Sequence, residues 1–212
     1  MCIRDSIWIG TFRGLNKNNV HDYHQYFCTD DSLGLPDNQI THLLRDSKNR
    51  FWVGTVNGVC LYTDKDNFRI IPIEADNKNV RQILEDRNGR IFLNTGFQLY
   101  AYHPREEKIT CVLPEISPGN AFYAQCHIAP DNNLWVMTST GLRCYDPSTL
   151  QLKESVALSG YPYYSYLHNN ELWITGNHTL SIFDTRTRSF KPLPQPIARN
   201  TTLCNADIDY IH

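Results

Sequence analysis

The sequence FWVGTVNGVCLY, residues 51–62, decides the fold because its pattern recurs along the chain. An aromatic anchor, Trp52, is followed ten positions later by a second aromatic residue, Tyr62. The anchors are Trp8, Trp52, Phe92, Trp135 and Trp173, separated by 44, 40, 43 and 38 residues, and the second aromatics are Tyr62, Tyr102, Tyr145 and Phe183. A repeat of about 40 residues therefore organises the chain.

Each repeat contains four short apolar segments separated by Asp, Asn, Gly and Pro, such as ITHLLRD, FWVGT, VCLYT and FRIIPI. Segments of this length and composition are typical of β-strands, and no helical period competes with them. Four antiparallel strands in about 40 residues predict a blade of an all-β propeller, with the aromatics between blades. Tandem β-sandwiches would need about 100 residues per unit.

An apolar-x-x-apolar-x-x-Asp/Asn frame precedes each anchor. Its members are Ile40, Leu43 and Asp46; Val80, Ile83 and Asp86; Gln125, Ile128 and Asp131; and Tyr164, Leu167 and Asn170. We expect Asp46, Asp86 and Asp131 to share one repeat position and to form Asx turns rather than an acid/base pair.

The repeats divide residues 7–212 into a partial unit 7–34, four units 35–77, 78–118, 119–159 and 160–197, and a partial unit 198–212. Because both ends fall within a unit, we expect a fragment of a propeller that forms an open arc. Residues 1–6, MCIRDS, resemble the translation of a sequencing-library adapter and are interpreted as non-native.

The composition, 41% hydrophobic and 20% charged with a net charge of −2, is ordinary for a globular protein. It supplies no basic field to attract nucleic acid, and no apolar run is long enough to span a bilayer. The seven cysteines stand singly, with none of the density of a disulfide scaffold.

The unit LPDNQITHLLRD, residues 35–46, followed by FWVGTVNGVCLY, residues 51–62, resembles the two-component regulator propeller repeat. Residues 131–146 match well, and the other units match in part. Residues 92–95, Phe-Leu-Asn-Thr, depart from the Trp-Ile-Gly-Thr core of the family, and Asn18 stands where the first unit should carry its second aromatic.

The resemblance implies a non-enzymatic segment of the extracytoplasmic, periplasmic sensor region of a two-component regulator. It also implies an oligosaccharide ligand, further blades and signalling domains in a parent chain, a possible parent homodimer, and a histidine kinase outside this segment. The alternatives are an enzymatic propeller, such as a lyase or hydrolase, and a protein-interaction scaffold; fold alone does not choose among them.

No arrangement of residues predicts catalysis, a metal site or a cofactor. His21 and His24 lie three apart but lack further metal ligands, and adjacent Cys126 and His127 should point to opposite faces of a strand.

Tyrosines gather before and within the expected first strands of two neighbouring blades, in residues 120–125 and 161–166. Loops that enter these strands lie at one mouth of a propeller, where aromatic rings with hydroxyl groups suit a sugar. We therefore expect Tyr123, Tyr161, Tyr163 and Tyr164 to line a ligand surface; the alternative is that they pack between blades.

Overall fold

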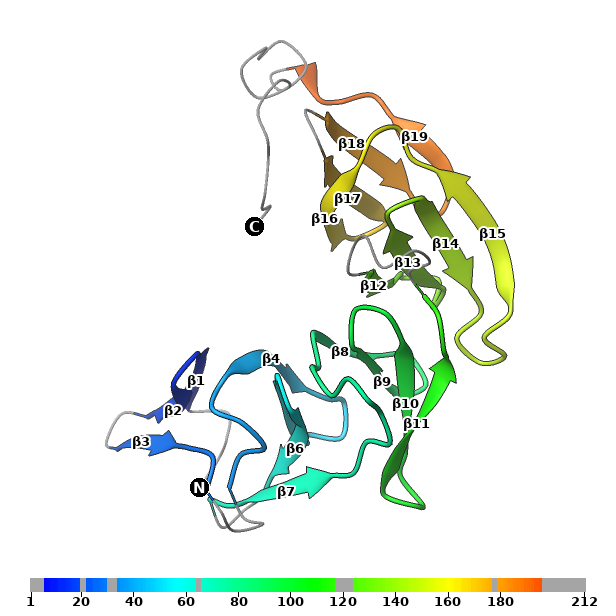
Figure 1. Ribbon diagram of the computed structural model, residues 1–212. Coiled ribbons are helices and arrows are strands. Elements are labelled where there is room, and N and C mark those ends of the chain that lie inside the picture. The colour runs from blue at the N-terminus through cyan, green and yellow to red at the C-terminus, as the bar shows by residue number, and fades with distance from the viewer. Residues whose placement is uncertain are drawn as a thin grey trace. The chain divides into compact units, whose positions relative to one another are not determined.

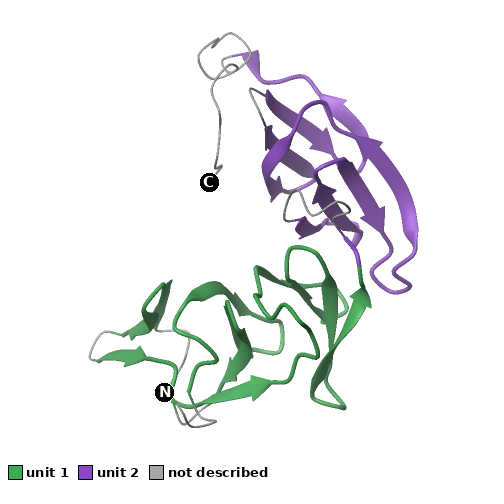
Figure 2. Ribbon diagram, in the orientation of Figure 1, with its two compact units in different colours: residues 1–114 green, residues 115–212 purple. Residues whose placement is uncertain are grey.

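The computed structural model describes residues 6–19, 22–29, 34–63, 66–116, 124–176 and 179–195. The chain divides into two compact units, residues 1–114 and residues 115–212 (Figure 2). Residues 1–5 of the expected adapter segment and the expected partial unit 198–212 lie outside the described residues. Among the described residues, no helix has the length and apolar character needed to cross a bilayer.

The first unit contains three antiparallel sheets whose strands follow one another in chain order (Figure 1). The first sheet has three strands, β1 (Ile7–Thr11), β2 (Gly14–Asn18) and β3 (Tyr23–Tyr26). The second contains β4 (Ile40–Arg45), β5 (Phe51–Thr55), β6 (Gly58–Tyr62) and β7 (Phe68–Ile71). The third contains β8 (Gln82–Glu85), β9 (Ile91–Asn94), β10 (Leu99–His103) and β11 (Lys108–Leu113).

The second unit contains two four-stranded antiparallel sheets. The first contains β12 (Gln125–Ile128), β13 (Leu134–Thr138), β14 (Gly141–Tyr145) and β15 (Leu152–Ala157). The other contains β16 (Pro162–His168), β17 (Glu171–Gly176), β18 (Thr179–Asp184) and β19 (Ser189–Lys191). The prediction of an all-β chain built from four-stranded antiparallel sheets is confirmed.

A threonine-to-glycine turn closes the tight hairpins. In the β5–β6 turn, Thr55 Oγ1 donates a hydrogen bond to the carbonyl of Gly58 at 2.9 Å, and Gly58 has φ 135°. The β13–β14 turn repeats this geometry with Thr138 and Gly141 at 3.0 Å. A Cβ on Gly141 would lie 2.3 Å from the carbonyl oxygen of Val156, so glycine is required there for space as well as for its φ of 150°.

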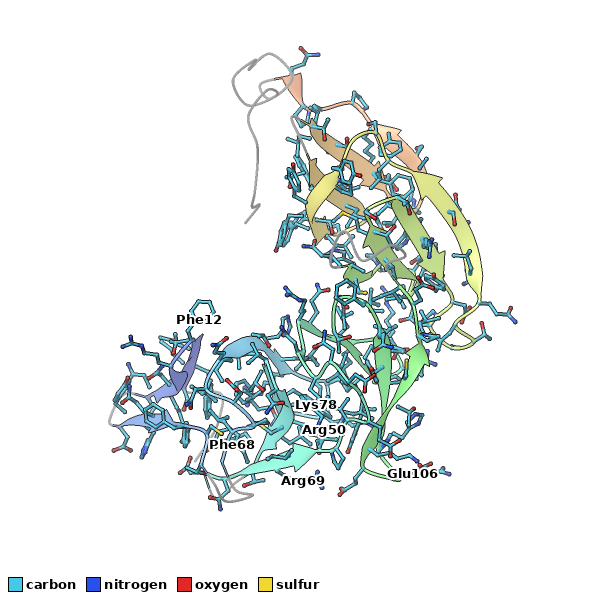
Figure 3. All side chains as sticks on the ribbon, in the orientation of Figure 1. Phe12, Arg50, Phe68, Arg69, Lys78 and Glu106 are labelled. Atoms are coloured by element: carbon cyan, nitrogen blue, oxygen red, sulfur yellow. The ribbon has the colours of Figure 1, made fainter. Side chains whose placement is uncertain are left out.

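The sheets pack face to face through buried apolar side chains. Trp52 and Tyr100 belong to one such core between the second and third sheets, and Trp135 and Phe183 belong to another in the second unit. Phe12, at the turn between β1 and β2, is 81% exposed and points away from the sheets (Figure 3).

The anchor tryptophans contact the second aromatic residue of the sheet that follows. All these contacts are edge-to-face, the geometry that aromatic pairs prefer. The pairs are Trp8 and Tyr62, with ring centroids 4.9 Å apart, Trp52 and Tyr102, 4.9 Å apart, and Trp135 and Phe183, 5.1 Å apart. Of the remaining aromatic positions, Phe92 and Tyr145 are buried and Trp173 is half-buried.

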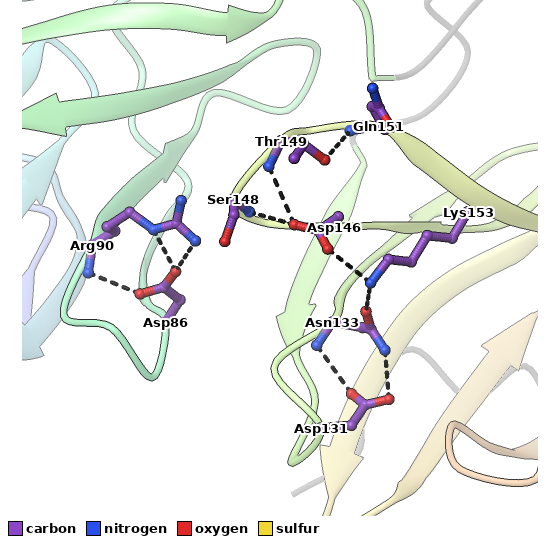
Figure 4. A network of polar contacts seen from close by, with 9 residues as sticks. All are labelled: Asp86, Arg90, Asp131, Asn133, Asp146, Ser148, Thr149, Gln151 and Lys153. Atoms are coloured by element: carbon purple, nitrogen blue, oxygen red, sulfur yellow. Dashed lines mark hydrogen bonds and ion pairs between the residues drawn. The ribbon is translucent and has the colours of Figure 1, made fainter.

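Asp46 holds the anchor Trp52 in the second sheet. Its Oδ2 accepts hydrogen bonds from Trp52 Nε1 at 2.8 Å and Arg50 Nε at 2.6 Å, and the Arg50 guanidinium lies over the indole. Burial alone would raise the pKa of Asp46, but the hydrogen bonds from Trp52 and Arg50 outweigh it and lower the pKa. Asp86 and Arg90 form the same carboxylate pair in the third sheet (Figure 4).

The expectation that Asp131 shares this repeat position is wrong. The backbone bonds of the turn, from Asp46 N to the Arg50 carbonyl and from Asn49 N to the Asp46 carbonyl, recur at Ala129, which bonds to Asn133 and Asn132 in the same way. Asp46 precedes its anchor by six residues, whereas Asp131 precedes Trp135 by only four. The sequence alignment of this repeat was therefore displaced by two residues, and Ala129 is the equivalent of Asp46.

Candidate functional site

The expected tyrosine site lies at the start of β16 in the second unit. Tyr161, just before the strand, is 58% exposed, while Tyr163 and Tyr164 are half-buried. Tyr166, which we did not single out from the sequence, is 39% exposed. It shares a strand face with Tyr164 because side chains alternate with a period of two. Tyr123 lies outside the described residues.

The backbone around Tyr161 and Tyr163 is irregular. Pro162 pairs with Gly176 and Tyr164 pairs with Thr175, so Tyr163 is the extra residue of a β-bulge. A bulge changes the direction of neighbouring side chains and is frequent beside binding sites. A Cβ on Gly176 would lie 2.4 Å from the carbonyl oxygen of Tyr161, so glycine at the end of β17 permits the close approach of this backbone.

A buried polar contact holds β16 against β12. Gln125 Oε1 accepts hydrogen bonds from the Ser165 backbone N–H at 2.6 Å and from Ser165 Oγ at 2.9 Å. His127 Nε2 lies 2.8 Å from Ser165 Oγ. Ser165 is only 2% exposed. These bonds join β12 to β16, the first strands of the two sheets, on the strand face opposite Tyr164 and Tyr166.

The Ser165–His127 pair has the geometry of a serine and a base but not their usual environment. Burial lowers the pKa of His127 to about 4, so the ring is neutral at pH 7. In the part of the chain that the structure describes, no carboxylate hydrogen-bonds to His127, whereas catalytic serine–histidine pairs use one to orient the ring. The contact therefore works as a structural link between strands.

The other candidates from the sequence remain separate. Burial raises the pKa of the Cys126 thiol, whose side chain is buried, and His127 bonds to Ser165. His24 stacks on Tyr26 with ring centroids 6.3 Å apart, and His21 lies outside the described residues. No group of three or more His, Cys, Asp or Glu side chains within the described ranges is arranged to hold a metal ion.

A second polar network joins the strand ends of the β12–β15 sheet (Figure 4). Asp146 accepts hydrogen bonds from the backbone N–H of Ser148 at 2.8 Å and forms an ion pair with Lys153 Nζ at 2.9 Å. The hydrogen bond from Lys153 is the main cause that lowers the pKa of Asp146. Lys153 also donates to Asn133 Oδ1 at 2.7 Å, and Asn133 donates to Asp131. Each residue drawn makes at least one polar contact with another residue drawn, as in a structural turn.

The sheet architecture and the inter-sheet aromatic contacts define a β-propeller. Residues 34–57 match the family model of the two-component regulator propeller, which confirms the resemblance seen in residues 35–46 and 51–62. No curated protein matches the sequence significantly.

Solved structures support the same fold. The extracellular domain of a hybrid two-component system from B. thetaiotaomicron has a TM-score of 0.71 at 22% identity over 98% of this chain. A second such domain from that organism has a TM-score of 0.55 at 15% identity over 97% of this chain. The chain spans 29% and 36% of these structures.

Enzymes with this fold are also similar in structure. A catalytically inactive virginiamycin B lyase from Staphylococcus aureus, solved with quinupristin, has a TM-score of 0.67 at 15% identity. The match covers 89% of this chain and 67% of the lyase. At these identities the likeness establishes the fold and leaves the activity to the site itself.

Proposed function

We propose that this chain is a ligand-sensing propeller segment of the extracytoplasmic sensor region of a two-component regulator, and that it performs no catalysis. The match of residues 34–57 carries the proposal. The structural similarity to extracellular domains of hybrid two-component systems supports both the role and the extracytoplasmic location. The parent protein would contribute further blades, a histidine kinase and a dimer interface.

The ligand in this proposal is an oligosaccharide that binds at Tyr161, Tyr163 and Tyr164, with Tyr123 from the neighbouring repeat. Tyr166 extends this surface because it shares a strand face with Tyr164. Exposed tyrosine rings offer a flat apolar surface for a sugar ring, and their hydroxyl groups can bond to its edge. The bulge at Tyr163 and the open position of Tyr161 favour binding, since rings that served only to fill the core would be buried.

The link through Ser165 suggests how binding is transmitted. A ligand that shifts β16 would pull on Gln125 and His127 of β12, because three short contacts join these strands. The response would therefore pass from one sheet to its neighbour through their first strands.

Glycan binding tests the proposal directly. The full protein encoded at the locus would be screened on an array of plant and host oligosaccharides, and the strongest binder would be titrated by calorimetry. We expect Tyr161→Ala and Tyr163→Ala together to weaken binding at least tenfold, about 1.4 kcal/mol. Phe12→Ala is the matched control, because Phe12 is an exposed aromatic residue, 81%, in the first unit and lies outside the tyrosine site.

Unchanged affinity in the double variant, with the control also unchanged, would reject the tyrosine site. The lyase alternative is tested by incubating the protein with quinupristin and measuring its mass spectrum. We expect no product, because the described residues around His127 include no carboxylate partner for it; turnover would refute the non-catalytic role.

A further inference from the structure

The first unit contains a pocket of about 300 Å³ between the end of β3 and the turn that enters β7. This volume is at the lower end of the range for small-molecule sites. Its walls combine aromatic rings with a carboxylate and two amides: Gln25, Tyr26, Phe27, Asp66, Asn67 and Phe68. The pocket is formed by residues far from the tyrosines of β16 in sequence and belongs to the other compact unit.

Asp66 presents one occupied and one available oxygen. Its Oδ1 accepts hydrogen bonds from Lys17 Nζ at 2.8 Å, from Tyr26 Oη at 2.8 Å and from Tyr62 Oη. Among the described residues, Oδ2 has no hydrogen-bond partner, and the side chain is 45% exposed. The bonds from Lys17 and Tyr62 lower the pKa of Asp66 to about 2, so this carboxylate is an acceptor at any physiological pH.

Lys17 sets the charge of the site. Its ammonium group, with the side chain only 3% exposed, lies between the rings of Trp8 and Tyr62 at 5.3 and 5.0 Å from their centroids. It forms an ion pair with Asp66 on the side away from solvent, so the carboxylate is already neutralised. A ligand cation would compete with the Lys17 ammonium group for Asp66, and a ligand anion would be repelled by the Asp66 carboxylate.

The remaining walls suit a ring that carries hydroxyl groups. Phe27 is 46% exposed, so its ring can cover an apolar face of a ligand. Tyr26 is half-buried and stacks on Trp8 with ring centroids 5.8 Å apart, so it supports the wall from within. Gln25 uses its Nε2 to donate to Asn16 and Tyr23, which leaves its Oε1 as an acceptor. The Asn67 side-chain amide can both donate and accept hydrogen bonds. A ligand hydroxyl group can do the same, so the two groups are complementary.

We propose that this pocket binds a neutral, hydroxyl-rich ring, such as a single sugar residue, with a pair of hydroxyl groups donating to Asp66 and Gln25. The inference does not depend on the tyrosine surface or on the regulator role proposed above. It rests on the available Asp66 oxygen, the internal neutralisation by Lys17 and the exposed Phe27 ring.

Amide chemical shifts of the 212-residue chain would test the pocket. The probes are D-glucose, D-galactose and N-acetyl-D-glucosamine as neutral rings, with methylammonium and acetate as charged probes. We expect at least one sugar to shift the amides of Phe27, Asn67 and Phe68 saturably, and the charged probes to leave them unchanged. Phe27→Ala and Asn67→Ala should each weaken that binding about tenfold, because each removes one wall and leaves the Lys17 ion pair intact.

Tyr161→Ala is the control, since it alters the tyrosine surface and should leave the pocket unaffected. Tighter binding of methylammonium than of any sugar would overturn the proposal, as would the absence of a saturable shift with all three sugars. Unchanged sugar affinity in both pocket variants would overturn it too. The folded state of each variant is checked by the dispersion of its amide spectrum.

Discussion

Trp52 and Trp135 occupy the same place in two sheets, yet their indole N–H groups have different surroundings. Trp52 donates to Asp46, which Arg50 also holds. Trp135 Nε1 is buried, and no acceptor among the described residues reaches it, because Ala129 replaces the aspartate. The edge-to-face contact with the following sheet persists at both positions. The aromatic packing therefore defines the repeat, and the carboxylate is an additional support that one sheet has and the other lacks.

Removing the carboxylate should have the largest effect. We expect Asp46→Ala to lower the free energy of unfolding by about 4 kcal/mol, because it leaves the buried Trp52 N–H without an acceptor and the Arg50 guanidinium, 24% exposed, without its ion-pair partner. Urea unfolding followed by circular dichroism measures this change. A loss below about 1 kcal/mol would show that Asp46 adds little to the second sheet.

Acid should act on the second unit through His127. Its pKa is about 4 when folded and 6.5 as an ordinary histidine, so the neutral ring stabilises the fold above pH 6.5. That stability is lost as the pH falls from 6.5 towards 4, by on the order of 3 kcal/mol since each pKa unit is worth about 1.4 kcal/mol.

His127→Gln keeps a hydrogen-bond donor for Ser165 and removes the titratable ring. Burial also lowers the pKa of His42, so this variant separates the contribution of His127 to the pH dependence from that of His42. The free energy of unfolding of this variant should depend less on pH between 6.5 and 4. Parallel pH profiles for the variant and the parent chain would contradict the assignment.

Replacing each indole by a phenyl ring compares the two anchors directly. Trp52→Phe loses the hydrogen bond to Asp46, whereas Trp135→Phe removes an N–H group that has no described acceptor. We expect Trp52→Phe to cost about 1 kcal/mol more than Trp135→Phe in urea unfolding, the net value of one hydrogen bond. Equal costs would mean that the bond to Asp46 contributes nothing.

The smallest effect should come from Asp131→Ala. Asp131 is exposed and, within the part of the chain that the structure describes, bonds to Asn133 alone, outside the position of Asp46. We expect a change within about 0.5 kcal/mol, as for most surface substitutions. A loss comparable to that of Asp46→Ala would restore the equivalence of the two residues that the sequence frame suggested.

Local patterns were enough to predict the sheets because aromatic spacing and turn residues are encoded within each repeat. The same patterns were not enough to align every repeat. Asp131 was aligned with Asp46 because both are aspartates, although the two residues lie at different distances from their tryptophan anchors. The pocket at Asp66 had no signal at all, because Lys17 lies 49 residues away in sequence. A lysine beside Asn18, where an aromatic was expected, reveals its role only when the sheets are packed.

The aromatic contacts give the array a direction. Each pair joins the tryptophan of one sheet to the second aromatic of the next sheet and not the reverse. Duplication of one complete repeat adds one sheet face that carries the tryptophan and one that carries the second aromatic. A longer array therefore keeps all its contacts between sheets. Gene duplication in register with the repeat can therefore change the number of blades without new interface mutations, whereas a duplication out of register would bring two like surfaces together.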